Sequence, residues 1–273
     1  MNTVTPIKNI LTPYDGSPQA KNALWYAISL TKLVSGHLTI LKSYNVAMET
    51  TTADATTSIY PIALTDFREI TEDELSELNS EFKELDEVQY TTVSSPGIII
   101  TAIEIYTEDN PTDMIIMGTD GANGWDEFIG GSTTANMVGN TASTPLWVVP
   151  HTVKSYEPPK NIAIAVDPDN TPAAEKITFL KEVSTLFSAE VSVIYVADKK
   201  TESINTFAES IELNTPVHWL QGDIDDALLD FSTTNDIDVL FVVHKDRNFF
   251  ASLFHSSVAK KIVSHASMPV IVL

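Results

Sequence analysis

The chain has 273 residues, of which 43% are hydrophobic and 19% charged, a composition that excludes a wholly disordered protein. It contains no cysteine, which excludes disulfide scaffolds, cysteine zinc sites, iron–sulfur clusters and thiol nucleophiles. Acidic residues outnumber basic ones 37 to 16, and a formal net charge of −21 repels phosphate backbones and anionic lipids, so we expect neither nucleic acid nor membranes as partners.

The first residues do not read as a targeting segment. They lack a basic stretch followed by an apolar run, so we expect no signal peptide. The sequence also lacks a run of about 18 apolar residues, the length that a membrane-spanning helix needs. These features predict a cytoplasmic protein.

One sequence pattern occurs twice. The segment IKNILTPYD at 7–15 is similar to PKNIAIAVD at 159–167, and Asp15 and Asp167 stand 152 residues apart. Later segments correspond as well: TDMIIMG and TPLWVV in the first half match IDVLFVV and MPVIVL in the second. A repeat of this length is a domain rather than a solenoid unit. We therefore predict two domains, 1–150 and 158–273, with a polar, proline-bounded linker between them.

Each half alternates strands and helices in its predicted elements. In the first half, apolar runs predict strands at 9–14, 37–44, 88–93, 113–117 and 145–149. Start signals and periodicity predict helices at 18–34 (opened by Ser17 and Pro18), 71–85 (opened by the capping box Thr71–Glu74), 98–108 and 132–142. The Thr-rich stretch 45–65 is predicted to be a long loop, and in the second half Gln221–Asp223 opens a helix through Phe231. Short buried strands between helices indicate a mostly parallel sheet covered on both faces.

The richest motif follows the strand at 113–117. The segment MGTDGANGWDEFIGGSTTANM holds five of the chain's ten glycines and then opens a helix at Ser132. Glycine lets a backbone approach a ligand closely, and the N–H groups at a helix N-terminus attract anions. In such sheets ligands bind at the carboxyl ends of the strands. The segment therefore indicates a phosphate-binding loop, with a flexible loop that ends in a Ser/Thr cap as the structural alternative.

The spacing Gly118-x2-Gly121-x9-Gly131-Ser132, with ILTPYD, IIMG and STPLWVV around it, resembles ATP-binding universal stress proteins over essentially the whole chain. The resemblance implies two tandem α/β domains of flavodoxin-like (Rossmann-like) fold. Each would be a five-stranded parallel sheet of order 3-2-1-4-5 with helices on both faces. It also implies a stress-response regulator that binds ATP, or ADP or AMP, in its first domain and hydrolyses it slowly or not at all.

The same resemblance assigns roles to residues at the strand ends. Pro13, Tyr14 and Asp15 would line the adenosine end, the Ser43 backbone would meet the adenine, and Met117 and Gly118 would flank the ribose. The phosphates would contact Gly121, Gly131, Ser132, Thr133 and Thr134. For Asp15 there is a structural alternative, which is to cap the first helix. Ser17 already supplies such a cap, and this favours the ligand role.

The loop departs from the pattern in its charge. There is no Lys or Arg between Lys83 and Lys154, and the loop carries Asp120, Asp126 and Glu127. Like charges beside a triphosphate weaken binding unless a cation bridges them. Asp126 and Glu127 are therefore candidate Mg²⁺ ligands through the nucleotide, with solvated surface acids as the alternative. The charge leaves the identity of the nucleotide open.

The second half has lost the glycines. Val243, Asp246 and His255 stand in the places of Gly118, Gly121 and Gly131, and a Cβ at each position blocks close backbone approach. We predict that this half does not bind ATP in the family manner. It carries a basic and aromatic cluster that indicates either an anion or partner site or ordinary packing: Lys245, Arg247, Phe249, Phe250, Phe254 and His255.

Nothing in the sequence indicates efficient catalysis. The first-domain crevice offers no histidine as a general base, and no G-x-S-x-G motif is present. The leading hypothesis is a nucleotide-responsive binding module that acts on an unidentified protein partner. A slow Mg²⁺-dependent ATPase and a ligand-free scaffold are the alternatives. The last strands of the two halves are apolar, and the family resemblance implies pairing through this edge, so we expect the halves to pair with each other as a pseudo-dimer. We also expect the chain to form a homodimer, since homo-oligomers are common.

Overall fold

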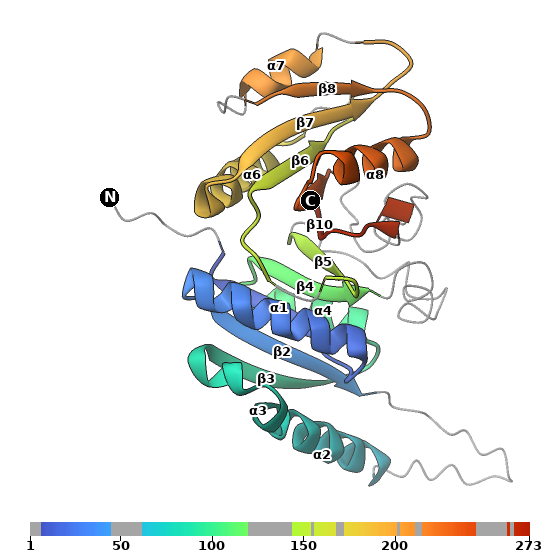
Figure 1. Cartoon of the computed structure of the whole chain (residues 1–273). Coiled ribbons are helices and arrows are strands. Elements are labelled where there is room, and N and C mark those ends of the chain that lie inside the picture. The colour runs from blue at the N-terminus through green and yellow to red at the C-terminus, as the bar shows by residue number, and fades with distance from the viewer. Residues whose placement is uncertain are drawn as a thin grey trace, which may run out of the picture.

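A computed structural model describes residues 7–44, 62–119, 144–153, 156–167, 172–200, 203–210, 215–243, 261–262 and 265–273. In these residues ten strands form one sheet in the order β3-β2-β1-β4-β5-β10-β9-β6-β7-β8. The sheet runs the length of the molecule, with β3 and β8 at its ends (Figure 1).

The two halves of the chain each contribute five strands. The first half holds β1 (Asn9–Pro13), β2 (His37–Tyr44), β3 (Gln89–Pro96), β4 (Met114–Thr119) and β5 (Leu146–Pro150). The second holds β6 (Asn161–Ala165), β7 (Glu190–Val196), β8 (Val217–Leu220), β9 (Val239–Val242) and β10 (Val270–Val272). Within each half the strands pair in parallel and, read from the outer edge, lie in the order 3-2-1-4-5. The predicted fold class is confirmed, except that the two five-stranded sheets are joined into one.

Helices cover both faces of the sheet, and a cluster of buried side chains lies between each face and its helices. One face carries α1 (Pro18–Val34), α2 (Ile62–Ser76), α3 (Leu78–Glu81), α6 (Ala174–Phe187) and α7 (Ser203–Ser210). The other carries α4 (Ile99–Asp109) and α8 (Ile224–Thr234). Among the helices that the structure describes, none combines the length and the apolar character needed to cross a membrane.

Helix α1 has the predicted bounds, and local chemistry explains both ends. The Ser17 hydroxyl oxygen accepts a hydrogen bond from the Ala20 N–H, and Pro18 follows at the first helical position. The helix ends at Ser35, whose left-handed backbone has a φ of 49°. Its buried face packs on β1, β2, β4 and β5.

The second predicted helix is wrong in its bounds. Helix α2 begins at Ile62, so Thr71 of the supposed capping box lies inside it, with 4% of its surface exposed. The helix ends at Ser76 and is followed by α3 and by a 3-10 turn, η1 (Lys83–Glu87). Packing of α2 against β2 and β3 outweighs the local start signal. The rest of the predicted long loop, 45–61, and the predicted helix at 132–142 lie outside the described residues.

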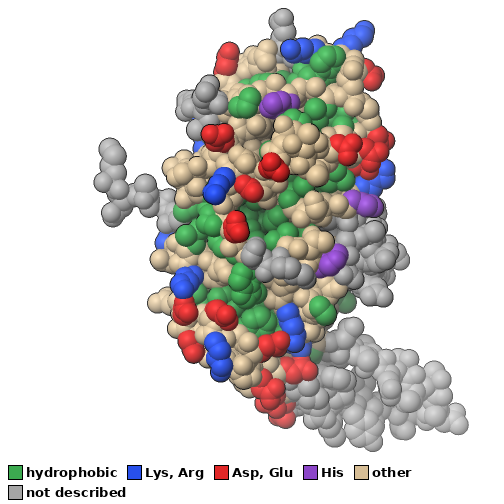
Figure 2. Space-filling view, in the orientation of Figure 1, with side chains coloured by type: hydrophobic (Ala, Val, Ile, Leu, Met, Phe, Trp, Pro, Cys, Tyr) green, Lys and Arg blue, Asp and Glu red, His purple; other side chains and the backbone are tan. Residues whose placement is uncertain are grey.

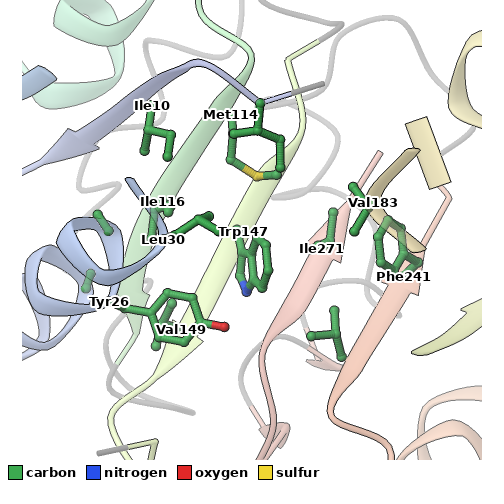
Figure 3. Close-up of a cluster of buried hydrophobic side chains, with 14 of the residues drawn as sticks. Ile10, Tyr26, Leu30, Met114, Ile116, Trp147, Val149, Val183, Phe241 and Ile271 are labelled. Carbon is green, nitrogen blue, oxygen red and sulfur yellow. The ribbon is translucent and has the colours of Figure 1, made fainter. Parts of the chain in front are cut away.

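The two halves meet where β5 and β10 pair in antiparallel fashion, Trp147 opposite Ile271. Trp147 is fully buried, and its ring centroid lies 5.5 Å from that of Tyr26 on α1 and 6.3 Å from that of Phe187 on α6. Figure 3 shows Trp147 between Tyr26 of the first half and Ile271 of the second. The predicted pairing of the two last strands is therefore confirmed, while the domain limits 1–150 and 158–273 stay predictions.

The repeated Lys-Asn motif has a structural role at the amino end of each half. The Asp113 Oδ2 atom accepts hydrogen bonds from the N–H groups of Lys8 (2.9 Å) and Asn9 (2.8 Å) and from the Asn9 side-chain amide (3.2 Å). In the second half, Asp238 Oδ2 accepts from the N–H groups of Lys160 (2.7 Å) and Asn161 (2.8 Å). These bonds tie β1 to the start of β4 and β6 to the start of β9.

Candidate functional site

The candidate site lies where the strand order reverses in the first half. Strand β1 lies between β2 and β4, and the chain leaves it through α1 on one face and reaches β4 from α4 on the other. At such a reversal the carboxyl ends of the strands leave a crevice that binds ligands in open α/β sheets. Ile10 pairs with Met114, and this register places Pro13 level with Met117. The structure thus brings the predicted residues of β1 and β4 together, with Ser43 one strand away on β2.

Tyr14 belongs to the core rather than to an open surface. Its side chain is 6% exposed, its ring packs edge-on against Phe82 with centroids 6.5 Å apart, and its N–H donates to the Leu41 carbonyl at 2.8 Å. Burial raises the pKa of Tyr14 to about 12, and the carboxylates of Glu81 and Asp15 add to the shift. Pro13 is buried as well. A ligand contact by Tyr14 would therefore involve its backbone.

Asp15 is exposed and shapes the turn into α1. Its Oδ1 atom accepts a hydrogen bond from the Ser17 N–H at 2.9 Å, and Gly16 between them has a φ of 81°. This is an Asx turn, which presents Ser17 as the cap of the helix. The alternative that Asp15 itself caps the helix is wrong, because Ser17 is the cap and Asp15 supports the turn before it. The role of Asp15 as a ligand contact stays a prediction.

Gly118 permits a close approach of α1 to β4. A Cβ at this position would lie 2.2 Å from the Gln19 carbonyl oxygen and 2.6 Å from its carbon. Only a residue without a Cβ fits such a contact with backbone atoms. The sequence pattern assigned Gly118 to the ribose, whereas the contact seen in the structure is with the first turn of α1.

The second half differs at the same place. Ile162 pairs with Val239 as Ile10 pairs with Met114, so Val243 stands where Gly118 stands in the first half. Helices α1 and α6 both end at a left-handed serine, but α1 has 17 residues and α6 has 14. Helix α1 therefore extends about one turn further towards the carboxyl edge of the sheet. Val243 packs against the core, and its side chain is incompatible with a backbone contact as close as that between Gly118 and Gln19.

The remaining predicted site residues lie outside the described part of the chain. These are the phosphate-loop residues Gly121, Gly131, Ser132, Thr133 and Thr134, and the candidate magnesium ligands Asp126 and Glu127. The basic and aromatic cluster at 245–255 is outside it too. Among the residues that are described, no group of three or more His, Asp or Glu side chains is arranged to hold a metal ion.

The structure adds Lys42, which the sequence analysis missed. Lys42 lies at the carboxyl end of β2 on the same face as Leu38 and Ile40, and its side chain is only 15% exposed. It forms an ion pair with Glu74 of α2. Burial lowers the pKa of Lys42, and the Asp15 carboxylate acts in the opposite direction. Strand alternation was the available signal, because a period of two places Lys42 on the buried face of the segment HLTILKSY.

Charge elsewhere does not single out another site. On the face shown in Figure 2, Asp and Glu side chains are distributed along the molecule rather than gathered in one patch. Most ion pairs in the described residues are exposed, as in Lys32 with Glu87 and Arg68 with Glu72. Such pairs contribute little to stability and mark no site by themselves.

Known proteins place the fold in context. Comparison with curated protein sequences gave no match. A universal stress protein from Archaeoglobus fulgidus DSM 4304 is 16% identical, with a TM-score of 0.69 over 97% of this chain and 95% of that chain. A putative universal stress protein from Pseudomonas aeruginosa UCBPP-PA14 is also 16% identical, with a TM-score of 0.60 over 100% of this chain and 95% of that one.

A third solved structure is shorter. It is a universal stress protein from Archaeoglobus fulgidus in complex with dAMP, 20% identical, with a TM-score of 0.33 over 41% of this chain and 96% of that chain. The model of the universal stress protein family matches residues 6–150 and 202–273, and so includes parts of both halves. The chain therefore belongs to the universal stress protein family.

Proposed function

We propose that the chain binds an adenine nucleotide in its first half and acts as a nucleotide-responsive binding module in stress-response regulation. The observation that carries the proposal is the contact between Gly118 and Gln19, which brings the N-terminus of α1 to the end of β4 at the reversal of strand order. The second half has Val243 at this place and a shorter helix, so the proposed site belongs to the first half alone.

The first half offers groups that suit the ribose and the phosphates of a nucleotide. The exposed Asp15 carboxylate suits ribose hydroxyls, which donate hydrogen bonds. The N-terminus of α1 favours negative charge nearby. The glycines and hydroxyl groups of the segment 118–134 supply N–H and O–H donors for phosphates. ATP, ADP and AMP are all candidates, with Mg²⁺ bridging Asp126 and Glu127 when several phosphates are present.

The partner and the assembly are part of the proposal. Nucleotide bound at 118–134 changes the surface that a partner protein contacts, in a protein that we expect to be cytoplasmic. The edges of β5 and β10 are already paired with each other. A homodimer would therefore use another surface, and the sheet ends at β3 and β8 are the two edges that the described strands leave open.

Calorimetric titration with ATP, ADP and AMP, each with and without Mg²⁺, tests the proposal. The protein is first checked for nucleotide released on denaturation. We expect one site per chain, weakened at least tenfold by Gly131→Val because a side chain would exclude the phosphates, with His255→Val in the second half as the matched control. Two sites per chain would contradict the assignment to the first half. A nucleotide-free protein that binds none of the three would contradict the proposal and favour the ligand-free scaffold.

A further inference from the structure

We propose that the chain forms a homodimer by antiparallel pairing of strand β3 with β3 of a second copy. The two ten-stranded sheets then become one continuous sheet with a twofold axis at its centre. This inference rests on the homodimer included in the proposed function. It adds the surface, the direction of the pairing and the residue at the axis.

Strand β3 is an edge that lacks the usual protection against pairing. It pairs only with β2 among the described strands and forms one end of the sheet (Figure 1). Proteins protect such an edge with a very short strand, with charged residues or prolines, with a bulge or with a covering segment. Strand β3 has eight residues, and each of them pairs with one residue of β2 without a bulge. A long and regular edge of this kind is a template for another strand.

The sequence of β3 suits pairing with a copy of itself. The chain has a net charge of −21, yet residues 88–103 contain no Asp, Glu, Lys or Arg. The strand QYTTVSSP is rich in residues that favour strands, and its proline stands at the last position. Helix α2 packs on β3 but leaves the side chains of Gln89, Thr91 and Thr92 exposed. Two β3 strands can therefore meet without placing like charges opposite each other.

A second copy is the occupant that the rest of the sheet favours. The chain already uses antiparallel edge pairing once, where β5 and β10 join its two halves. The other open edge, β8, has only four residues and follows Pro216, which has no N–H group. Pairing of β3 with β3 closes after two chains because both contribute the same surface, whereas pairing of β3 with β8 would continue into filaments.

The alternation of side chains selects the residue at the twofold axis. Tyr90 packs on the face that carries α1, and Val93 packs on the other face. Directly opposite residues of an antiparallel pair point to the same face, so the axis passes through a residue rather than between two. Pro96 has no N–H group, and pairing of the remaining residues 89–95 is centred on Thr92. The two Thr92 side chains then lie opposite each other, a pair that stabilises sheets.

Helix α2 gives the dimer a dependence on salt. It packs on β3, and in the dimer its two copies lie on the same face, one on each side of the axis. Its exposed charges are mainly acidic, with Glu69, Glu72 and Asp73 against Arg68. Repulsion between the two copies of α2 weakens as salt screens it, so the dimer should become tighter at higher ionic strength.

Sedimentation equilibrium over a range of protein concentrations tests the inference. We expect an equilibrium between monomer and dimer. Thr92→Lys places two ammonium groups opposite each other and should raise the dissociation constant of the dimer at least tenfold. Thr233→Lys makes the same change at an exposed threonine of α8, and as the matched control it should leave the dimer unchanged. Trp219→Lys tests the β8 edge and should also leave it unchanged.

Two complementary variants test the position of the axis. Thr92→Glu should be as monomeric as Thr92→Lys, because two carboxylates then lie opposite each other. A mixture of the two variants should recover the dimer, since each mixed pair places an ammonium group opposite a carboxylate. Recovery requires residue 92 to lie opposite its own copy, which a merely structural role of Thr92 does not provide. A mixture that stays monomeric would overturn the assignment of the axis to Thr92.

The outcomes separate this inference from the proposed function. An unaltered protein that stays monomeric at every concentration contradicts the homodimer itself. A dimer that survives Thr92→Lys, or one that only Trp219→Lys disrupts, overturns the contact through β3, and so does growth beyond two chains. Should the Thr92 variants not fold, hydrogen exchange decides, because the amides of 89–95 in the unaltered protein should exchange more slowly as its concentration rises. AMP titration is read separately and tests nucleotide binding alone.

Discussion

Gly118 of β4 and Gln19 of α1 touch through their backbones, with room for no Cβ on the glycine. Helix α1 has 17 residues and its counterpart α6 has 14, and the Cβ of Val243 is incompatible with so close a backbone contact in the second half. A residue that the sequence pattern assigned to ligand binding is thus also a packing residue, and stability measurements can test this role without any ligand.

Gly118→Ala should lower the free energy of unfolding by about 2–3 kcal/mol, because the new Cβ meets backbone atoms that cannot rotate away. Gly16→Ala is the matched comparison. It has no neighbour within 4 Å but a φ of +81°, so only backbone strain of about 1 kcal/mol is expected. Urea denaturation of both variants measures the difference. A Gly118→Ala variant no less stable than Gly16→Ala would show that α1 and β4 can separate at little cost.

Asp113→Ala should destabilise the protein by about 2 kcal/mol, because three N–H donors lose a charged acceptor. Asp238→Ala should cost less, since Asp238 accepts two such bonds and the Asn161 side chain donates instead to the Asp236 carbonyl. The free energies of unfolding of the two variants, determined side by side, check this order. The reverse order would show that the number of hydrogen bonds accepted by Asp113 and Asp238 does not determine the loss of stability.

Trp147→Phe should remove the most blue-shifted part of the tryptophan fluorescence, because Trp147 is fully buried between the two halves. The indole N–H of Trp147 has no hydrogen-bond partner in the described residues. Removing this unpaired group offsets part of the cost of the cavity, so we expect the free energy of unfolding to fall by about 1–2 kcal/mol. Trp219→Phe on the edge strand β8, 37% exposed, is the control and should remove emission at longer wavelength. An emission spectrum unchanged by Trp147→Phe would contradict the buried junction.

Tyr14→Phe should flatten the loss of stability at alkaline pH. Burial raises the pKa of Tyr14 from 10.0 in the unfolded chain to about 12 in the fold, so its hydroxyl ionises first in the unfolded state. Its contribution is fully present below pH 10 and disappears as the pH rises towards 12. Between about pH 9 and about pH 11, the free energy of unfolding should fall more steeply in the unaltered protein than in Tyr14→Phe. Equal slopes would place the phenol in water.

The sequence predicted the elements whose signals are local. The start and end of α1 follow from Ser17, Pro18 and Ser35, each of which acts within one turn of itself. The Thr71–Glu74 box failed because the same residues also satisfy the middle of a helix, and only contacts with β2 and β3 decide where α2 lies. Strand β3 extends to Pro96, beyond the predicted end, because it pairs with β2 as far as Tyr44.

The candidate site was predictable in its location but not in its contacts. The alternation of strands and helices predicts a parallel sheet, and the family resemblance implies the strand order that reverses at β1 and β4. The burial of Tyr14 against Phe82 and the pairing of Lys42 with Glu74 join residues 68 and 32 positions apart. Such contacts depend on the packing of α2 and α3, whose bounds the sequence analysis did not obtain. Sequence analysis did not predict the turn that Asp15 forms with Ser17, although its hydrogen bond spans only two residues.

The antiparallel contact between β5 and β10 joins two copies of one domain inside a single polypeptide. This contact is intramolecular, so it does not depend on protein concentration. Dilution cannot separate the two copies, and they remain paired at any abundance of the protein in the cell. A pair of separate, identical subunits must keep both of its sites or lose both, since one mutation alters them together. In the fused chain each copy changes independently, which is how the first half can keep Gly118 while the second accepts Val243.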